Sequence, residues 1–123
     1  MPPTKVLFFR EESGRVPLLD WLDRLPERVQ IKCLARLQRL GFLGHELRRP
    51  EADLLWEGIY ELRASYQGVH YRMLYFFHKS EAIVVSHGIK KEREVPAAEI
   101  DRAVTRKRHF ERAPEAHTFA GER

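Results

Sequence analysis

With 123 residues, 43% of them hydrophobic, the chain is long enough for one compact core and too short for two ordinary domains. Its 22 lysines and arginines outnumber its 18 acidic residues, and the formal charge of +4 favours an acidic partner, nucleic acid first. A single cysteine excludes an intrachain disulfide. Because the sequence shows neither a signal peptide nor an apolar run of membrane-spanning length, we expect a cytoplasmic protein with no membrane partner.

The first half of the chain predicts a strand followed by two helices. Residues 5–10 (KVLFFR) form a short apolar run, which predicts a strand that pairs with a later sheet. Apolar residues at helical spacing predict a helix from Val16, and Pro26 separates it from a second helix over about residues 27–40, which Gly41 ends. Residues 42–57 have no sustained period and predict an ordered loop.

The second predicted helix has an apolar face and a basic face. The apolar face predicts burial for Val29, Cys33, Leu34, Leu37 and Leu40. The opposite face carries Arg28, Lys32, Arg36 and Arg39. Such a row forms either a solvated stripe or a surface that follows nucleic-acid phosphates, and in the second interpretation Arg36 and Arg39 bind RNA.

Residues 58–91 predict three consecutive antiparallel strands. A two-residue hairpin turn, Gln67-Gly68, separates strands over residues 59–66 and 69–77. Counting outward from this turn gives three facing pairs: Leu62 with Met73, Tyr60 with Tyr75, and Arg63 with Arg72.

The turn around residues 78–81 sets the pairing of the third strand. A loop of two or four residues places Phe76 opposite Ile83 and Arg72 opposite His87, whereas a loop of three would shift every pair by one and reverse the faces. We expect two or four, because apolar residues then meet apolar residues and polar residues meet polar ones. This register predicts a row of Arg63, Arg72 and His87 on one side of the sheet.

Two interpretations of this row remain open. Arginines that face each other on a sheet repel. Either Glu61, diagonal to Arg72, neutralises the pair on a solvated surface, or the two guanidinium groups hold a phosphodiester beside the titratable imidazole of His87.

The rest of the chain predicts a basic patch, a third helix and a tail. Lys90, Lys91 and Arg93 follow the third strand, and Pro96 begins a helix. The buried positions of this helix are Ile100, Ala103, Val104 and Phe110. Beyond Arg112 the periodicity is lost, which predicts one domain over residues 1–112 and a flexible tail over residues 113–123.

These patterns predict an α+β fold with no metal and no cofactor. The N-terminal strand and helical hairpin pack on an antiparallel sheet, and a helix follows at the C-terminus. The sequence has no zinc-ligand spacing, no glycine-rich nucleotide loop and no paired carboxylates on one element. Cationic and aromatic chemistry on a small sheet remains, and this chemistry suits RNA.

Three motifs in this order resemble the RelE/ParE toxin superfamily. They are DLLWEGIYELR (residues 53–63), YRMLY (71–75) and HGIKK (87–91), and the likeness is greatest to the HigB-like, phage-derived branch. The resemblance implies a toxin of a toxin–antitoxin pair that cleaves mRNA, in many members only on a translating ribosome. It also implies a cognate antitoxin, which in this branch is a helix-turn-helix protein.

The resemblance assigns residues as well. The family's two strand arginines fall on Arg63 and Arg72, and its basic pair falls on Lys90 and Lys91. RelE has a catalytic aromatic residue shortly after the last strand, where this chain has Glu94-Val95-Pro96. Proton transfer is therefore left to His87, or to the phenol of Tyr60 or Tyr71.

The prediction is a metal-independent endoribonuclease in which the RNA 2′-hydroxyl attacks its own phosphodiester. Arg63, Arg72 and Lys91 bind the phosphate and His87 is the general base or acid. Further RNA contacts come from Lys90, Arg93, Arg36 and Arg39. Two other classes stay open: a ParE-like toxin that inhibits DNA gyrase, and a non-enzymatic module whose basic face binds nucleic acid or protein.

Overall fold

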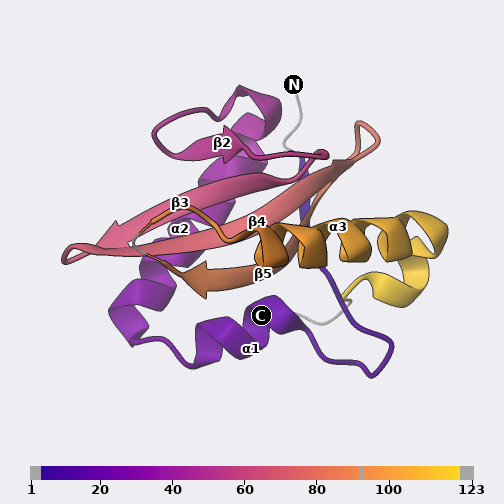
Figure 1. Ribbon diagram of the computed structural model, residues 1–123, viewed down its shortest axis with the longest axis horizontal. Coiled ribbons are helices and arrows are strands. Elements are labelled where there is room, and N and C mark those ends of the chain that lie inside the picture. Colours follow the sequence, from indigo (N-terminus) through magenta and orange to yellow (C-terminus); the bar gives the residue numbers. More distant parts are fainter. Residues whose placement is uncertain (1–3, 92, 120–123) are drawn as a thin grey trace.

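The computed structural model describes residues 4–91 and 93–119 and has the predicted α+β architecture (Figure 1). A five-stranded sheet has the strand order β1-β5-β4-β3-β2, in which β1 joins β5 in parallel and the other pairs are antiparallel. In chain order the elements are β1 (Lys5–Phe8), α1 (Pro17–Asp23), α2 (Glu27–Leu43), the 3-10 helix η1 (Gly44–Glu46), β2 (Ala52–Leu54), β3 (Tyr60–Tyr66), β4 (Val69–His78), β5 (Ala82–Lys90), α3 (Ala97–Arg112) and the 3-10 helix η2 (Pro114–His117). No helix among the described residues is long and apolar enough to cross a membrane.

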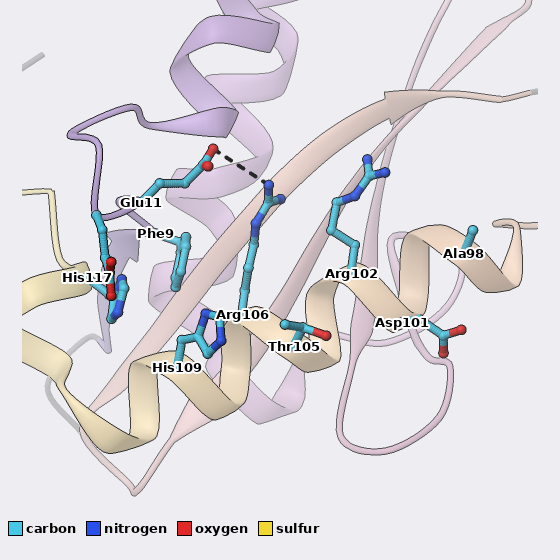
Figure 2. A pocket seen from close by; sticks show the side chains of 10 residues that line it. Phe9, Glu11, Ala98, Asp101, Arg102, Thr105, Arg106, His109 and His117 are labelled. Carbon is cyan, nitrogen blue, oxygen red and sulfur yellow. Dashed lines mark ion pairs between the residues drawn. The ribbon is translucent and has the colours of Figure 1, made fainter.

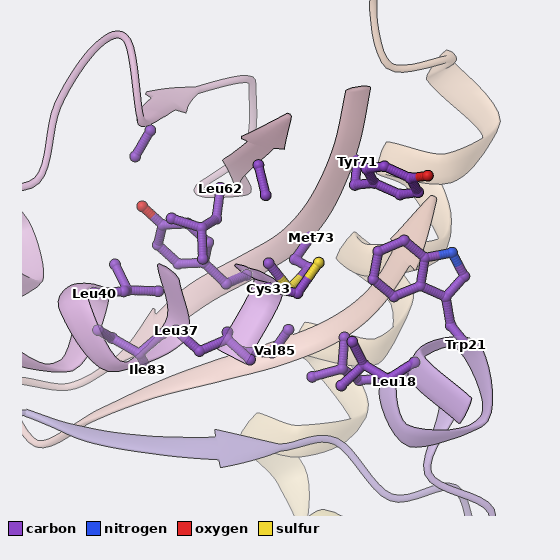
Figure 3. Packing of buried hydrophobic residues seen from close by; sticks show 14 of the residues in the cluster. Leu18, Trp21, Cys33, Leu37, Leu40, Leu62, Tyr71, Met73, Ile83 and Val85 are labelled. Atoms are coloured by element: carbon purple, nitrogen blue, oxygen red, sulfur yellow. The ribbon is translucent and has the colours of Figure 1, made fainter. Parts of the chain in front are cut away.

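Helices cover both faces of the sheet. On one face α1 packs against β5, and α2 packs against β3 and β1. Trp21, Cys33 and Met73 lie in the core on this side (Figure 3). On the other face α3 supplies the four buried residues that its periodicity predicted, Ile100, Ala103, Val104 and Phe110.

The register predicted for the first hairpin is confirmed. β3 and β4 pair Leu62 with Met73, Tyr60 with Tyr75, and Arg63 with Arg72. Both turn residues have positive φ, 49° at Gln67 and 80° at Gly68, as a type I′ turn requires. A turn of two residues therefore places the two arginines opposite each other.

The register predicted for the second hairpin is wrong. The loop between β4 and β5 contains three residues, 79–81, so that Phe76 faces Val84 rather than Ile83. Phe76 and Val84 therefore point toward α3, and Ile83 points toward α1 and α2. The loop length reverses the faces of this half of β5, as an odd shift of register must.

A β-bulge at Ser86 shifts the register a second time. Ser86 is left out of the pairing between β4 and β5, and His87 then lies opposite Leu74. Arg72 faces Ile89, so the predicted pairing of Arg72 with His87 is also wrong. The bulge nevertheless returns His87 to the face of the sheet that carries Arg72. His87 lies on that face two residues before Ile89, the residue of β5 that faces Arg72.

The second helix continues one turn beyond its predicted end. Gly41 lies inside α2, where its carbonyl accepts a 2.9 Å hydrogen bond from the Thr4 N–H and an added Cβ would lie 3.2 Å from Val6 Cγ2. The absent side chain lets β1 approach the helix. The helix ends instead before Gly44, which has a φ of 53°. Leu34, expected to be buried, is 37% exposed.

Two segments are more regular than predicted. The stretch 42–57, expected to be a loop, contains η1 and the short strand β2. Residues 113–119, predicted to begin a flexible tail, instead contact the chain around β1. The Phe119 N–H donates to the Phe8 carbonyl at 3.0 Å, and His117 Nδ1 lies 2.8 Å from the Arg10 carbonyl. Residues 120–123 of that prediction lie outside the described residues.

Candidate functional site

Arg63 and Arg72 share a buried carboxylate. Glu61 is only 1% exposed, and it accepts hydrogen bonds from Arg63 Nε and from Arg72 Nη1, the latter at 3.2 Å. The side chains of Arg63 and Arg72 remain 34% and 14% exposed. Glu61 therefore relieves the repulsion between the guanidinium groups while both still reach the surface.

A cleft of about 330 Å³ joins these arginines to cations from α2. We call it the cationic cleft; it is lined by Lys32, Arg36, Pro50, Glu51, Arg63, Ser65, His70, Tyr71 and Arg72. Glu51 is ion-paired with Arg39 at 2.6 Å and with Arg36 at 2.8 Å. Hydrogen bonding to Arg39, with the added charge of Arg36, holds the pKa of Glu51 below its usual range. The cleft thus has an excess of positive charge.

His70 lines the cationic cleft and was not among the site residues that the sequence analysis proposed. Its side chain is exposed, and Nδ1 lies 3.0 Å from Ser65 Oγ on the neighbouring strand. Alternation along β4 places His70 on the same face as Arg72, two residues away. That alternation is the signal that could have identified His70 from the sequence. Lys32 was noticed only as part of the basic row on α2.

His87 does not line the cationic cleft. It is 6% exposed beneath α3, where Nδ1 lies 2.7 Å from Ser86 Oγ and Nε2 lies 3.0 Å from Glu99 Oε1. Burial, and after it the positive charge of Arg106, lowers the pKa of His87 to about 4. At neutral pH the imidazole is uncharged and both ring nitrogens are engaged. His87 shares a face of the sheet with Arg72 but lies two residues along β5 from Ile89, which faces Arg72, and α3 covers it there.

The remaining predicted residues divide into two groups. Arg36 lines the cationic cleft, and Arg39 contacts its wall through Glu51. Lys90, Lys91 and Arg93 are exposed at the end of β5 and beyond it, outside the lining of the cleft. The main chain at Lys91 is still close to it, because the Lys91 N–H donates to the His70 carbonyl at 3.1 Å.

Of the two phenols considered for proton transfer, one reaches the cationic cleft. Tyr71 lines it, although the residue is only 5% exposed and its ring packs edge-on against Trp21. Tyr60 instead lines a separate pocket near His45. Among the described residues, no group of three or more histidine, cysteine, aspartate or glutamate side chains is placed to hold a metal ion.

A larger pocket, of about 510 Å³, lies between α3 and the chain that follows β1 (Figure 2). Arg106 crosses it, 3.8 Å from Glu11, with its guanidinium carbon 5.8 Å from the centre of the Phe9 ring. The lining of this pocket contains both acidic and basic side chains, and no site residue predicted from the sequence belongs to it. The cationic cleft is smaller but has the more selective chemistry, because it favours an anion.

The fold and the cleft define a small α+β domain that gathers cations beside its sheet. Residues 20–108 match the family described as phage derived protein Gp49-like (DUF891), and the chain belongs to this family, which is part of the RelE-like toxin superfamily. The chain has no match among the curated proteins with which it was compared.

Proposed function

We propose that the protein is the toxin of a type II toxin–antitoxin system and a metal-independent endoribonuclease of the HigB-like kind. The observation that carries this proposal is the cationic cleft, where Arg63, Arg72 and His70 line one space. Membership of the Gp49-like family supports it. The substrate we propose is mRNA, cleaved in association with the ribosome, and the inhibitor is a cognate helix-turn-helix antitoxin in the same cytoplasm.

The proposed reaction is an attack by the RNA 2′-oxygen on the adjacent phosphorus. The bond from phosphorus to the 5′-oxygen breaks, leaving a 2′,3′-cyclic phosphate and a 5′-hydroxyl. A base accepts the 2′-hydroxyl proton and the departing 5′-oxygen takes up a proton, so no co-reactant is consumed. Negative charge grows on the phosphoryl oxygens, where Arg63 and Arg72 would stabilise it. Arg36, Arg39, Lys90, Lys91 and Arg93 would bind the flanking phosphates.

His70 is the base that this geometry favours. The Ser65 hydroxyl is placed to orient the ring through Nδ1, which would leave Nε2 to accept the proton of a substrate bound in the cleft that His70 lines. The role predicted for His87 requires α3 to leave the sheet, because Glu99 on α3 engages the second ring nitrogen. We therefore assign proton transfer to His70 and treat Ser65 as its positioning residue.

The test of the proposed function uses variants that keep the fold. Removing only the arginines would leave Glu61 as a buried carboxylate without its partners, so we choose the triple variant Glu61→Gln/Arg63→Gln/Arg72→Gln. The control is Arg108→Gln/Arg112→Gln, which removes the same number of arginines from exposed positions on α3. Each protein is induced briefly in a bacterial host while growth and mRNA 5′ ends are followed.

Wild type and control should arrest growth and create new mRNA ends, and the triple variant should do neither. Purified protein should give 5′-hydroxyl products from free RNA in the presence of EDTA, and from ribosome-bound mRNA in a buffer that contains the magnesium ribosomes require. His70→Gln should slow cleavage by on the order of 10²–10⁴-fold. Growth arrest with intact mRNA would contradict RNA cleavage and favour a toxin that inhibits DNA gyrase. The absence of both effects in wild type would favour a non-enzymatic binding module.

A further inference from the structure

The outer side of α2 exposes an apolar stripe. Among the described residues five large hydrophobic side chains are exposed, and three of them lie on this helix: Ile31 at 59%, Leu34 at 37% and Phe42 at 69%. Together with Ala35 and Gln38 they recur every three or four residues and so share one side of the helix. We call these five residues the α2 stripe. At 1.5 Å per residue it is about 16 Å long.

The α2 stripe is distinct from the buried side of the same helix. Val29, Cys33, Leu37 and Leu40 face the sheet and belong to its core. A surface helix normally has one apolar side and one polar side. Here the side turned away from the core is mostly apolar as well, with Gln38 as the polar member of the stripe, and nothing in the described chain covers it.

Basic residues border the stripe along one flank. Arg28, Lys32, Arg36 and Arg39 follow that flank, and Ile31 and Ala35 line a groove of about 380 Å³ with them and Tyr66. Among the described residues, four basic side chains form this row, and the salt bridges of Arg36 and Arg39 both go to the same carboxylate, Glu51. The surface is therefore an apolar strip beside an excess of positive charge.

We infer that the α2 stripe is a docking site for an amphipathic helix of a protein partner, with apolar residues along its centre and acidic residues along one flank. An apolar strip beside basic residues is complementary to such a helix, which buries its apolar face in a groove and pairs its carboxylates at the rim. This inference does not depend on the ribonuclease activity.

Two other occupants fit the surface less well. A second copy of the chain would bring its own basic flank against this one, and like charges across an interface oppose association. RNA would find cations on the flank, but Ile31, Leu34 and Phe42 offer it neither hydrogen bonds nor charge. The combination of apolar centre and basic flank selects an acidic helix.

The test is a selection from a displayed library of helix-forming peptides about 20 residues long, which would span about 30 Å. The target is the purified full chain. We expect enriched peptides that combine an apolar stripe with an Asp- or Glu-rich flank. Their affinity should fall at least tenfold for Ile31→Ser/Phe42→Ser and for Arg28→Glu/Lys32→Glu. The matched control is Leu54→Ser/Trp56→Ser, which removes the two large exposed hydrophobic side chains that the described residues have outside α2 and should leave binding unchanged.

Other outcomes would overturn the inference. These are a selection that enriches no peptide, one whose peptides lack acidic residues, and one whose peptides bind Ile31→Ser/Phe42→Ser as tightly as wild type. Sedimentation of the wild type provides a further check. A dimer that Ile31→Ser/Phe42→Ser dissociates would identify the stripe as a contact between copies of this chain. Circular dichroism of each variant establishes that lost affinity is not lost fold.

Discussion

Replacing Arg72 with alanine should destabilise the protein through Glu61. Glu61 is 1% exposed, and Arg72 Nη1 lies 3.2 Å from one of its oxygens. Removing one partner of a buried ion pair costs about 3–5 kcal/mol. Two features reduce that figure here: Arg63 stays in contact with Glu61, and Arg72 Nε is buried with no hydrogen-bond partner among the described residues. We therefore expect a loss of about 2 kcal/mol in the free energy of unfolding.

A second substitution identifies the cause. If the cost arises from the buried charge, adding Glu61→Gln to Arg72→Ala should restore at least about 1 kcal/mol, because a neutral amide is cheaper to bury than a carboxylate. The matched control is Arg102→Ala. Arg102 pairs with Glu99 at 3.2 Å but is 56% exposed, so its loss should cost less than about 1 kcal/mol.

The measurement is urea unfolding followed by tryptophan fluorescence, with the three variants and wild type compared at one pH. The free energies are comparable if the slope with urea is the same for all four proteins. The reasoning would be refuted if Arg72→Ala matched wild type within about 0.5 kcal/mol, or if Glu61→Gln destabilised the Arg72→Ala protein further. Either result would mean that Glu61 does not depend on Arg72 in the fold.

Three further predictions concern the interior of the protein. An unfolded histidine titrates near 6.5 and folded His87 near 4, so the unfolded chain binds more protons between these values, and the stability that neutral His87 contributes is lost as pH falls through that range. Urea unfolding at pH 7 and pH 4 should show the advantage of wild type over His87→Gln shrinking by up to about 3 kcal/mol, whereas an equal advantage at both pH values would contradict the assignment. Burial raises the pKa of the Cys33 thiol to about 11, so a thiol reagent at pH 8 should label Cys33 only as urea unfolds the chain, and rapid labelling without urea would contradict its burial. Gly88→Ala should cost about 1–3 kcal/mol because the added methyl group would overlap the Trp21 ring, and an unchanged urea midpoint would show that the indole moves aside freely.

Local chemistry made the first hairpin predictable. Gln67-Gly68 admits positive φ at both turn positions, and a two-residue turn leaves only one register for the strands that follow. The facing of Arg63 and Arg72 then follows by counting, without knowledge of the rest of the fold. The buried residues of α3 were predictable for a similar reason, since their spacing alone determines which side of the helix is apolar.

The register of the second hairpin, between β4 and β5, could not be predicted in the same way. Residues 82–85 are all apolar, so they carry no alternation from which to tell one face of the strand from the other. Both faces are in fact buried, by α1 and α2 on one side and α3 on the other. A loop of three residues and a bulge at Ser86 shift the register twice, and the packing of the helices decides between registers that the local sequence leaves equivalent.

The cationic cleft was predictable only in part. Strand alternation accounts for Arg63, Ser65, His70 and Arg72, which share one face, but not for Tyr71, which belongs to the other face and still lines the cleft. The contribution of α2 depends on where the helix crosses β3. Helical spacing could place Lys32 and Arg36 on one side of α2 but could not show which strand that side meets. The site therefore combines a local pattern with a tertiary contact that no local pattern encodes.

The two interpretations of the arginine row are compatible. A guanidinium group has five N–H donors, and the contacts with Glu61 use only some of those on Arg63 and Arg72. A buried carboxylate between two facing arginines reduces their repulsion and orients both guanidinium groups. The N–H groups that do not contact Glu61 still border the cationic cleft. Neutralisation by Glu61 is therefore what makes two facing arginines tolerable in the sheet, and the cations from α2 keep the cleft attractive to a phosphodiester.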